Sequence, residues 1–468
     1  MDLTFFKNKR VTVFGLGLQG GGVGTVKFLV KQGARVIVTD IKAKEQLVPS
    51  LEALKGLKGV EFVLGQHHRE DFIKVDMVVK TPPVPWNNEY VKLALAHNIP
   101  VEMDSSLFFK FCKNPIIGVT GTKGKTTTAT LIYEILKLAG KNPVKVGIGQ
   151  ASVLDRLELL KKDSVVVFEL SSWRLSALGK AQMSPHIAVI KNILPDHLNY
   201  YRTIDDYLTD KENIFLYQKP KDFLIINEDD ERLRESSKKA KSQIIRFSGR
   251  PIKEGKAVFR EDNFIYLNDG VDTKKLVDIK DIKIPGEHNI YNIMAAAAAA
   301  YVYGIPIEQI KKAVVDFFGV PHRLEFVREL RGVRYFNDTA ATIPDAMMSA
   351  LESFVEPIVL IAGGTDKKLD FSRAGEEILK KVKYLVLLKG DATEKLLECI
   401  GKNLPEKEKG QSIEFEVVDS MQRAVELASQ KAEEGDVVLL SPGAASFGLF
   451  LNEFDRGDKF REAVNTIE

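Results

Sequence analysis

Residues 120–128 read Thr-Gly-Thr-Lys-Gly-Lys-Thr-Thr-Thr and form a loop that could bind the phosphate groups of a nucleotide. Glycines let backbone N–H groups turn toward an anion, and the helix expected to follow adds its positive end. Lys125 could reach the terminal phosphates, and the Thr126 hydroxyl could coordinate Mg²⁺. The pattern is irregular, because Val119 stands where the first glycine of a phosphate loop belongs. A ligand-free Gly/Thr-rich turn is the weaker interpretation, because Gly-Lys-Thr directly opens a helix after a buried strand.

Two further polar clusters follow predicted strands in the middle of the chain. The strand at 164–168 runs into Glu169, and the strand at 187–190 leads to His197. Open α/β sheets bind ligands at the carboxyl ends of their strands, so we expect both side chains on the same rim as the phosphate loop. A carboxylate and an imidazole beside a nucleotide triphosphate would suit Mg²⁺ coordination. Taken singly, Glu169 could equally be a capping or surface acid, and His197 a helix-capping histidine.

Residues 15–20 near the start of the chain read Gly-Leu-Gly-Leu-Gln-Gly between a predicted strand at 11–14 and a predicted helix. A second strand, at 35–39, ends at Asp40. This G-x-G-x-x-G pattern with a following acid is typical of a dinucleotide site, where glycines allow the backbone to approach a diphosphate. Alone it would indicate an NAD enzyme, but the same geometry serves any nucleotide diphosphate, and a simple tight turn is also compatible.

Three polar segments in the last third of the chain each follow a predicted strand. They are residues 337–342 after the strand at 333–336, residues 363–367 after 358–361, and residues 441–447 after 437–440. This alternation predicts another doubly wound sheet whose strand ends converge on one site.

The elements that position these segments predict an α/β protein of several domains. A chain of 468 residues is too long for one core. We expect a Rossmann-like domain at 1–113, a P-loop-type ATP-binding domain on a central sheet at 114–319, and a Rossmann-like domain at 320–468.

Composition narrows the function classes. The formal net charge is only +3, from 67 basic and 64 acidic residues, so no charge excess indicates binding to nucleic acid or a membrane surface. Two cysteines cannot form a disulfide framework or a zinc site by themselves. The longest apolar stretch, near 294–303, is far shorter than a bilayer span and predicts a buried helix. We expect a cytoplasmic monomer.

Three motifs together resemble the ATP-dependent Mur ligases of peptidoglycan synthesis. They are T-G-T-K-G-K-T-T from residue 120, E-L-S-S-W-R-L from residue 169 and D-H-L-N-Y-Y from residue 196. The likeness is strongest to the members that add D-glutamate to UDP-N-acetylmuramoyl-L-alanine. It implies an amide ligase that activates a carboxylate as an acyl phosphate with ATP and two Mg²⁺ ions. The first glycine loop would then bind the diphosphate of UDP rather than NAD.

The resemblance also implies a role for individual residues. ATP would be bound by Gly121, Thr122, Lys123, Gly124, Lys125, Thr126, Thr127, Asn292, Arg323 and Asp338. The UDP-linked substrate would be bound by Gly15, Leu16, Gly17, Asp40, Thr81 and Ser171. The amino acid would be bound by Thr342, Lys367, Ser446, Phe447 and Phe454, and the metal by Thr126, Glu169, His197 and Lys211. The catalytic residues would be Lys125, His197 and Lys211.

Lys211 matches a family lysine that CO₂ converts to a carbamate. A neutral amine that captures CO₂ becomes an anionic oxygen ligand, which can help to hold a second Mg²⁺. Without the resemblance, Lys211 would be interpreted as a surface lysine paired with a neighbouring acid. Four places depart from the family pattern. Ala340 stands where many members carry lysine, and Gly147 and Lys123 stand where many carry asparagine. Residues 81–84 read Thr-Pro-Pro-Val, where Ser-Pro-Gly-Ile is more usual.

Other functions remain open at this stage. One alternative is a sister ligase that adds L-alanine or a diamino acid, or a folylpolyglutamate-type ligase. Another is an NAD-dependent oxidoreductase with an accessory ATPase, which the first glycine loop would favour. A third is a non-catalytic protein that binds the UDP precursor, although the set of Lys125, Glu169, His197 and Lys211 argues against it.

Overall fold

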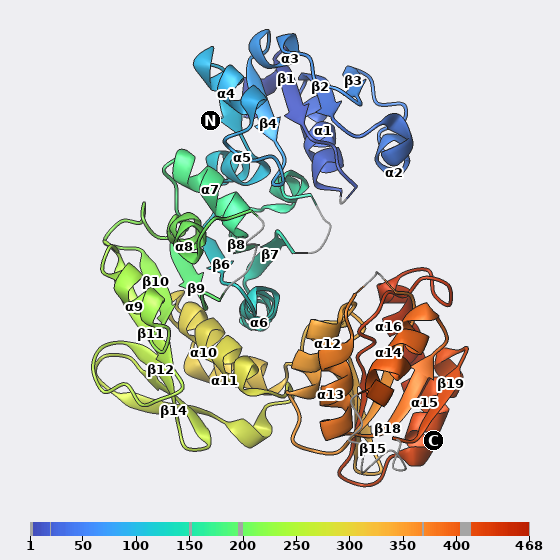
Figure 1. Ribbon diagram of the computed structural model, residues 1–468. Helices are drawn as coiled ribbons and strands as arrows, with labels where there is room; N and C mark the ends of the chain where they lie inside the picture. The colour runs from blue at the N-terminus through green and yellow to red at the C-terminus, as the bar shows by residue number, and fades with distance from the viewer. Residues whose placement is uncertain are drawn as a thin grey trace. The chain divides into compact units, whose positions relative to one another are not determined.

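The computed structural model describes residues 3–18, 20–148, 152–194, 200–366, 369–402 and 413–467. The chain forms two compact units. The first unit comprises Met1–Ile279 and Tyr291–Val314, and the second comprises Lys280–Ile290 and Val315–Glu468. The strands of the described residues form three sheets, two in the first unit and one in the second (Figure 1). The predicted α/β class is thus confirmed.

The first sheet is built from the N-terminal strands. They are β1 (Arg10–Phe14), β2 (Arg35–Asp40), β3 (Val60–Leu64), β4 (Met77–Lys80) and β5 (Val101–Glu102). Its helices are α1 (Gly21–Lys31), α2 (Val48–Glu52), α3 (Glu70–Ile73), α4 (Glu89–Ala96) and α5 (Asp104–Phe111). The order is β3-β2-β1-β4-β5, with parallel neighbours throughout. Val13 and Phe14 of β1 enter different core clusters, because both faces of a parallel sheet are covered.

The second sheet is larger and also lies in the first unit. Its strands are β6 (Ile116–Thr120), β7 (Asn142–Val146), β8 (Ser164–Glu169), β9 (Ile187–Ile190), β10 (Phe223–Asn227), β11 (Gln243–Ser248), β12 (Ala257–Glu261), β13 (Phe264–Asn268) and β14 (Thr273–Asp278). The order is β14-β13-β12-β11-β10-β9-β6-β8-β7. The strands from β7 to β12 in this order pair in parallel, and β12, β13 and β14 pair antiparallel. The segment from β10 to β14 therefore extends one side of the sheet and ends it with antiparallel strands.

Among the residues that the structure describes, six α-helices accompany the second sheet. They are α6 (Lys125–Leu138), α7 (Ser172–Lys180), α8 (Ile204–Glu212), α9 (Glu231–Ser237), α10 (Glu287–Val302) and α11 (Ile307–Val315). Short 3₁₀-helices span Leu3–Phe6, Lys44–Gln46, Leu154–Leu159 and Ile279–Asp281. The alanine run of α10 is completely buried from Ala295 to Ala300, as its composition predicted. No helix among the described residues has the length and apolar character needed to cross a membrane.

The third sheet forms the core of the second unit. Its strands are β15 (Glu325–Leu330), β16 (Val333–Asn337), β17 (Ile358–Gly363), β18 (Val382–Leu388), β19 (Phe415–Val418) and β20 (Val437–Leu440). Its helices are α12 (Pro344–Leu351), α13 (Ser372–Lys381), α14 (Asp391–Lys402), α15 (Met421–Lys431) and α16 (Glu453–Thr466). The order is β15-β16-β20-β17-β18-β19, antiparallel only between β15 and β16. Buried residues of α12 to α14 cover one face, and those of α15 and α16 cover the other.

Candidate functional site

The phosphate loop follows β6, which lies between β9 and β8 in the second sheet. Thr120 at the end of β6 pairs with Ile190, and Val119 pairs with Glu169. The chain therefore leaves three adjacent parallel strands at one edge, and this edge brings the loop and Glu169 together as the sequence predicted. His197 lies outside the described residues.

Hydrogen bonds from neighbouring segments fix the shape of the loop. The backbone N–H groups of Thr122 and Lys123 both donate to Oδ1 of Asn192, each at 2.9 Å. Gly124 precedes α6 with a φ of 80°, and a Cβ there would lie 2.2 Å from Oδ1 of Asn292. Glycine is therefore required at 124, both for the left-handed backbone and for the close approach of Asn292.

Two lysines converge on the loop. Nζ of Lys125 donates to the carbonyl oxygens of Gly121 at 3.0 Å and Thr122 at 2.9 Å. Nζ of Lys211, from α8, donates to the same Gly121 oxygen at 2.9 Å and to Oγ1 of Thr120 at 3.2 Å. The Lys211 side chain is only 1% exposed, so the interpretation of Lys211 as a surface lysine is wrong. A buried amine beside a phosphate loop is the placement that a carbamate ligand would need.

Glu169 provides a carboxylate at the same edge. Its Oε2 is buried and has no hydrogen-bond partner among the described residues. A buried carboxylate oxygen without a donor is costly unless a cation compensates for it, so this atom fits a divalent metal ion. Within the described ranges no group of three or more His, Cys, Asp or Glu side chains forms a complete metal site. Glu169 and Thr126 could therefore hold Mg²⁺ only with further ligands.

Lys191 is a component of this edge that the sequence reasoning missed. It directly follows β9, is 1% exposed, and its Nζ donates to Oδ1 of Asn292. Burial lowers the pKa of Lys191 well below its ordinary value. Oδ1 of Asn292 also accepts a hydrogen bond from Oγ1 of Thr128 at 3.4 Å. These donors fix the carboxamide of Asn292 next to the phosphate loop. The feature of the sequence that could have indicated this residue is a lysine directly after an apolar strand.

The predicted UDP-binding residues of the first sheet also lie together. Oδ2 of Asp40 accepts the backbone N–H groups of Leu16 at 2.8 Å and Gly17 at 3.1 Å. Thr81 follows the neighbouring strand β4, and a Cβ at Gly15 would lie 2.3 Å from its Oγ1. Asp40 thus stabilises the glycine loop, and its contact with a substrate stays a prediction.

Ser171 lies apart from that loop, at the N-terminus of α7 beside the second sheet. Its side chain caps the helix by accepting the N–H of Arg174 at 3.3 Å. Arg174 forms an ion pair at 3.0 Å with Asp104, the first residue of α5 beside the first sheet, and both side chains are largely buried. Ser171 therefore stands near the junction of the two sheets within the first unit.

In the second unit, Asp338 follows β16 and is buried. It accepts hydrogen bonds from the Ser441 hydroxyl at 2.9 Å and the Leu324 N–H at 3.1 Å. Burial outweighs these donors and the nearby Arg323, and it raises the pKa of Asp338 to about 7. Since Asp338 and Ser441 directly follow the neighbouring strands β16 and β20, the predicted convergence of polar strand ends is present here.

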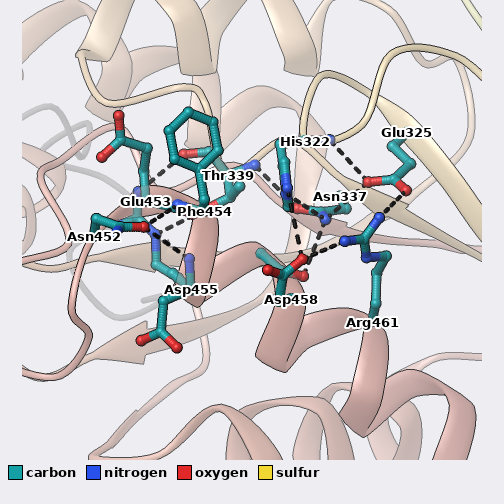
Figure 2. Close-up of polar contacts among 12 residues, drawn as sticks. His322, Glu325, Asn337, Thr339, Asn452, Glu453, Phe454, Asp455, Asp458 and Arg461 are labelled. Atoms are coloured by element: carbon teal, nitrogen blue, oxygen red, sulfur yellow. Dashed lines mark hydrogen bonds and ion pairs between the residues drawn. The ribbon is translucent and has the colours of Figure 1, made fainter. Parts of the chain in front are cut away.

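A polar network fixes the segment that carries Arg323. The backbone N–H of His322 and the side chain of Asn337 both donate to Oε2 of Glu325, at 2.8 and 3.1 Å (Figure 2). Arg461 of α16 pairs with Oε1 of Glu325 at 2.9 Å. His322 and Leu324 have positive φ values of 68° and 41°, a backbone conformation that needs such support. The network therefore sets the backbone on both sides of Arg323.

The predicted amino-acid-binding residues differ in their exposure to solvent. Ser446 is buried, whereas Phe447 and Phe454 are 61% and 49% exposed. The ring of Phe454 packs edge-on against His322, with a centroid distance of 5.5 Å (Figure 2). Thr342 is partly exposed and follows the turn after Asp338. Lys367 lies outside the described residues.

Known protein families and proteins match this chain along nearly its whole length. Residues 9–102 match the N-terminal domain of MurD-like Mur ligases, 119–300 the Mur ligase middle domain, and 322–443 the glutamate ligase domain of Mur ligases. A protein of Roseiflexus sp. named UDP-N-acetylmuramoylalanine--D-glutamate ligase is 42% identical over 98% of this chain and 99% of its own length. A protein of the same name from Clostridioides difficile is 38% identical over the full length of both chains.

Solved structures agree with the fold. The UDP-N-acetylmuramate-alanine ligase MurC of Thermotoga maritima superimposes with a TM-score of 0.56 at 19% identity, covering 98% of this chain and 100% of that one. A UDP-N-acetylmuramoyl-L-alanyl-D-glutamate--2,6-diaminopimelate ligase superimposes with a TM-score of 0.58 at 18% identity, covering 99% and 94%. The chain therefore belongs to the Mur ligase family, the ATP-dependent ligases that its sequence motifs predicted.

Proposed function

We propose that this Mur ligase joins D-glutamate to UDP-N-acetylmuramoyl-L-alanine in the cytoplasm, as a monomer, with hydrolysis of ATP to ADP and phosphate. The observation that carries the proposal is the convergence of Lys125 and Lys211 on the Gly121 carbonyl, next to the strand that ends at Glu169. The D-glutamate ligase name of the full-length relatives supports the choice of substrates. The match of 9–102 to a MurD-like domain argues against the NAD alternative.

Lys125 is the group that acts on the transferred phosphate in this proposal. Its ammonium now donates to two loop carbonyls, and it would exchange them for oxygens of the γ-phosphate when ATP binds. The alanyl carboxylate then attacks the γ-phosphorus, and ADP leaves. The amine of D-glutamate attacks the acyl phosphate, loses a proton, and expels inorganic phosphate. Lys125 stabilises the charge that develops in the first step.

Thr126, Glu169, His197 and a carbamoylated Lys211 would hold Mg²⁺, which when bound neutralises the triphosphate charge. Carbamoylation needs the neutral amine: its nitrogen attacks CO₂, a proton leaves, and an N-carboxylate remains. Lys211 is held for this by Thr120 and Gly121, which keep Nζ at the base of the loop. The unpartnered Oε2 of Glu169 supports the metal assignment.

The other predicted residues complete the proposal. We assign ATP to the phosphate loop with Asn292, Arg323 and Asp338. The UDP moiety is assigned to the glycine loop with Asp40, Thr81 and Ser171. D-glutamate is assigned to residues of the second unit, namely Thr342, Lys367, Ser446, Phe447 and Phe454. The functional domains are then 1–113, 114–319 and 320–468.

The test is ATP-dependent phosphate release with UDP-N-acetylmuramoyl-L-alanine and a panel of amino acids. D-glutamate should stimulate release, whereas L-alanine, diaminopimelate and L-lysine should not. Stimulation by one of those instead would contradict the acceptor and favour a sister ligase. The variant Lys125→Ala should bind the UDP substrate without turnover. Turnover unchanged in Lys125→Ala would contradict the role given to the phosphate loop.

A further inference from the structure

Lys80 is a buried lysine that none of the roles above uses. It ends β4, pairs in the sheet with Phe14 of β1, and is 1% exposed. Among the described residues it forms no ion pair, and burial lowers its pKa to about 8. A buried ammonium without a directly paired carboxylate is costly, whereas an apolar residue would fit the end of a buried strand without that cost.

Two contacts of the Lys80 ammonium are with one loop, residues 81–86. Its Nζ donates to the carbonyl oxygen of Val84 at 2.8 Å, and it lies 4.5 Å from the ring centroid of Trp86. It also lies 3.2 Å from Sδ of Met103. A cation over an indole ring is attracted by the ring's electron-rich face. Lys80 therefore contacts the loop at two points, Val84 and Trp86.

The 81–86 loop connects two parts of the first unit. At its start, the N–H and Oγ1 of Thr81 both donate to the Phe14 carbonyl, at 2.9 and 3.1 Å, directly before the glycine loop. At its end, Nε1 of Trp86 donates to Oγ of Ser176 in α7 at 2.8 Å. α7 begins just after Glu169 on the second sheet. The loop thus links the glycine loop of the first sheet to the helix beside the proposed metal-binding carboxylate.

We propose that Lys80 is a positioning residue for the UDP-linked substrate. Lys80 fixes the conformation of the 81–86 loop, and the loop in turn fixes the distance between the diphosphate site and the catalytic edge of the second sheet. This inference rests on the proposed function, because it takes Thr81 and the glycine loop as the UDP site. Lys80 itself is too deeply buried to touch the substrate, so its effect passes through Val84 and Trp86.

The matched control is Lys180. It lies on the same indole ring, with Nζ 5.9 Å from the centroid, but it is exposed and donates to no atom of the loop. Lys80→Met removes the cation and the hydrogen bond at similar side-chain length, Lys80→Arg retains both, and Lys180→Met removes only the outer cation.

The experiment measures steady-state kinetics of these full-length variants. Lys80→Met should raise KM for UDP-N-acetylmuramoyl-L-alanine about tenfold, with kcat and KM for ATP changed by less than about twofold. Lys80→Arg and Lys180→Met should stay within about threefold of wild type for every parameter. An equal rise of both KM values, or a Lys80→Met variant that behaves as Lys180→Met does, would overturn the inference.

A second measurement separates the inference from the proposed function. The chain has two tryptophans, so Trp173→Phe leaves Trp86 as the only indole reporter. In this background, titration with UDP-N-acetylmuramoyl-L-alanine without ATP should change the emission of Trp86, and Lys80→Met should weaken binding about tenfold. A wild-type chain that does not bind this compound would overturn the proposed function and the inference together. Normal wild-type binding that Lys80→Met leaves unchanged would overturn only the role of Lys80.

If Lys80→Met does not fold, Ser176→Ala tests the outer end of the same chain of contacts. It removes the acceptor of the Trp86 indole and should raise KM for the UDP substrate about threefold, with KM for ATP unchanged. An unchanged KM for the UDP substrate in Ser176→Ala would overturn the inference.

Discussion

Lys125 and Lys211 donate hydrogen bonds to the same oxygen atom, the carbonyl of Gly121, from two different helices. A carbonyl oxygen has two lone pairs and can accept both donors. Two ammonium groups on one acceptor repel each other. Lys211 is the more buried of the two, and a carbamate on Lys211 would replace this repulsion with an attraction to Lys125.

The first prediction concerns bicarbonate. Ligase activity in buffer depleted of CO₂ should fall severalfold and recover on addition of bicarbonate, because the anionic carbamate relieves the repulsion and supplies a metal ligand. Lys211→Met should be inactive at any bicarbonate concentration. The measurement is phosphate release at fixed pH, with chloride added in place of bicarbonate as the control. Activity independent of bicarbonate would contradict a carbamate.

The second prediction concerns Lys125. Lys125→Met should lower kcat by about 10²–10³-fold, because the variant lacks the cation that stabilises charge on the transferred phosphate. Its melting temperature should fall only slightly, because the Gly121 carbonyl keeps the hydrogen bond from Lys211 in the variant. Phosphate release and thermal unfolding check the two expectations. A variant with full kcat would exclude Lys125 from the reaction.

The third prediction concerns Asn192, whose Oδ1 accepts two N–H groups of the phosphate loop. Asn192→Ala leaves both without that acceptor, and KM for ATP should rise about 30-fold, at about 1 kcal/mol for each hydrogen bond. The control is Asn142→Ala, which removes an exposed amide on the same sheet and should leave KM for ATP unchanged. Equal effects of the two variants would show that the phosphate loop does not depend on Asn192.

The sequence predicted the main strands because buried parallel strands are nearly continuous apolar runs. β9 is Ile-Ala-Val-Ile and is buried at every residue, and β20 is Val-Val-Leu-Leu with the same pattern. Once such strands are placed, the polar segments that follow them must lie on one rim of the sheet. The sequence did not indicate β15 and β19, because both are edge strands with polar or exposed residues along their length.

The sequence could not predict which charged residues are buried. Lys80, Lys191 and Lys211 are each 1% exposed, yet a lysine is ordinarily a surface residue. Whether a lysine at the end of a strand or in a helix is buried depends on what packs over it, and those partners are distant in sequence. For example, Asn292, which accepts a hydrogen bond from the Lys191 side chain, lies about a hundred positions further along the chain.

The fourth prediction concerns Gly147, which directly follows β7. Its φ is 77°, and a Cβ there would lie 2.4 Å from the carbonyl oxygen of Glu169. Gly147→Ala should therefore lower the unfolding free energy by about 1–3 kcal/mol and raise the Mg²⁺ concentration needed for activity, because it displaces the strand end that carries Glu169.

The control for Gly147 is Gly140→Ala. Gly140 also has a positive φ, of 69°, but no atom lies within 4 Å of an added Cβ. It should show a loss of about 1 kcal/mol in urea unfolding and a normal Mg²⁺ requirement. A Gly147→Ala variant with the same profile as Gly140→Ala would indicate that the backbone near Glu169 can move without consequence.

The last prediction concerns the stability of the second unit and its dependence on pH. Burial raises the pKa of Asp338 from 3.8 to about 7, so between these values the folded state binds more protons than the unfolded state. Stability is therefore highest below about pH 4 for this group and falls as the pH rises through about 7. At about 1.4 kcal/mol per pKa unit, the total loss is at most about 4 kcal/mol. Asp338→Asn should remove this slope.

Hydrogen exchange of the amides of β16 and β20 is the appropriate measurement, because both tryptophans of the chain lie in the first unit and do not report on the second. Protection in the wild-type chain should decrease between pH 5 and pH 7.5 after correction for the intrinsic exchange rate, whereas protection in Asp338→Asn should not. Parallel behaviour of the two chains would mean that Asp338 ionises in the folded state near its ordinary pKa, held by Ser441 and the Leu324 N–H. That outcome would also place a permanent negative charge beside Arg323.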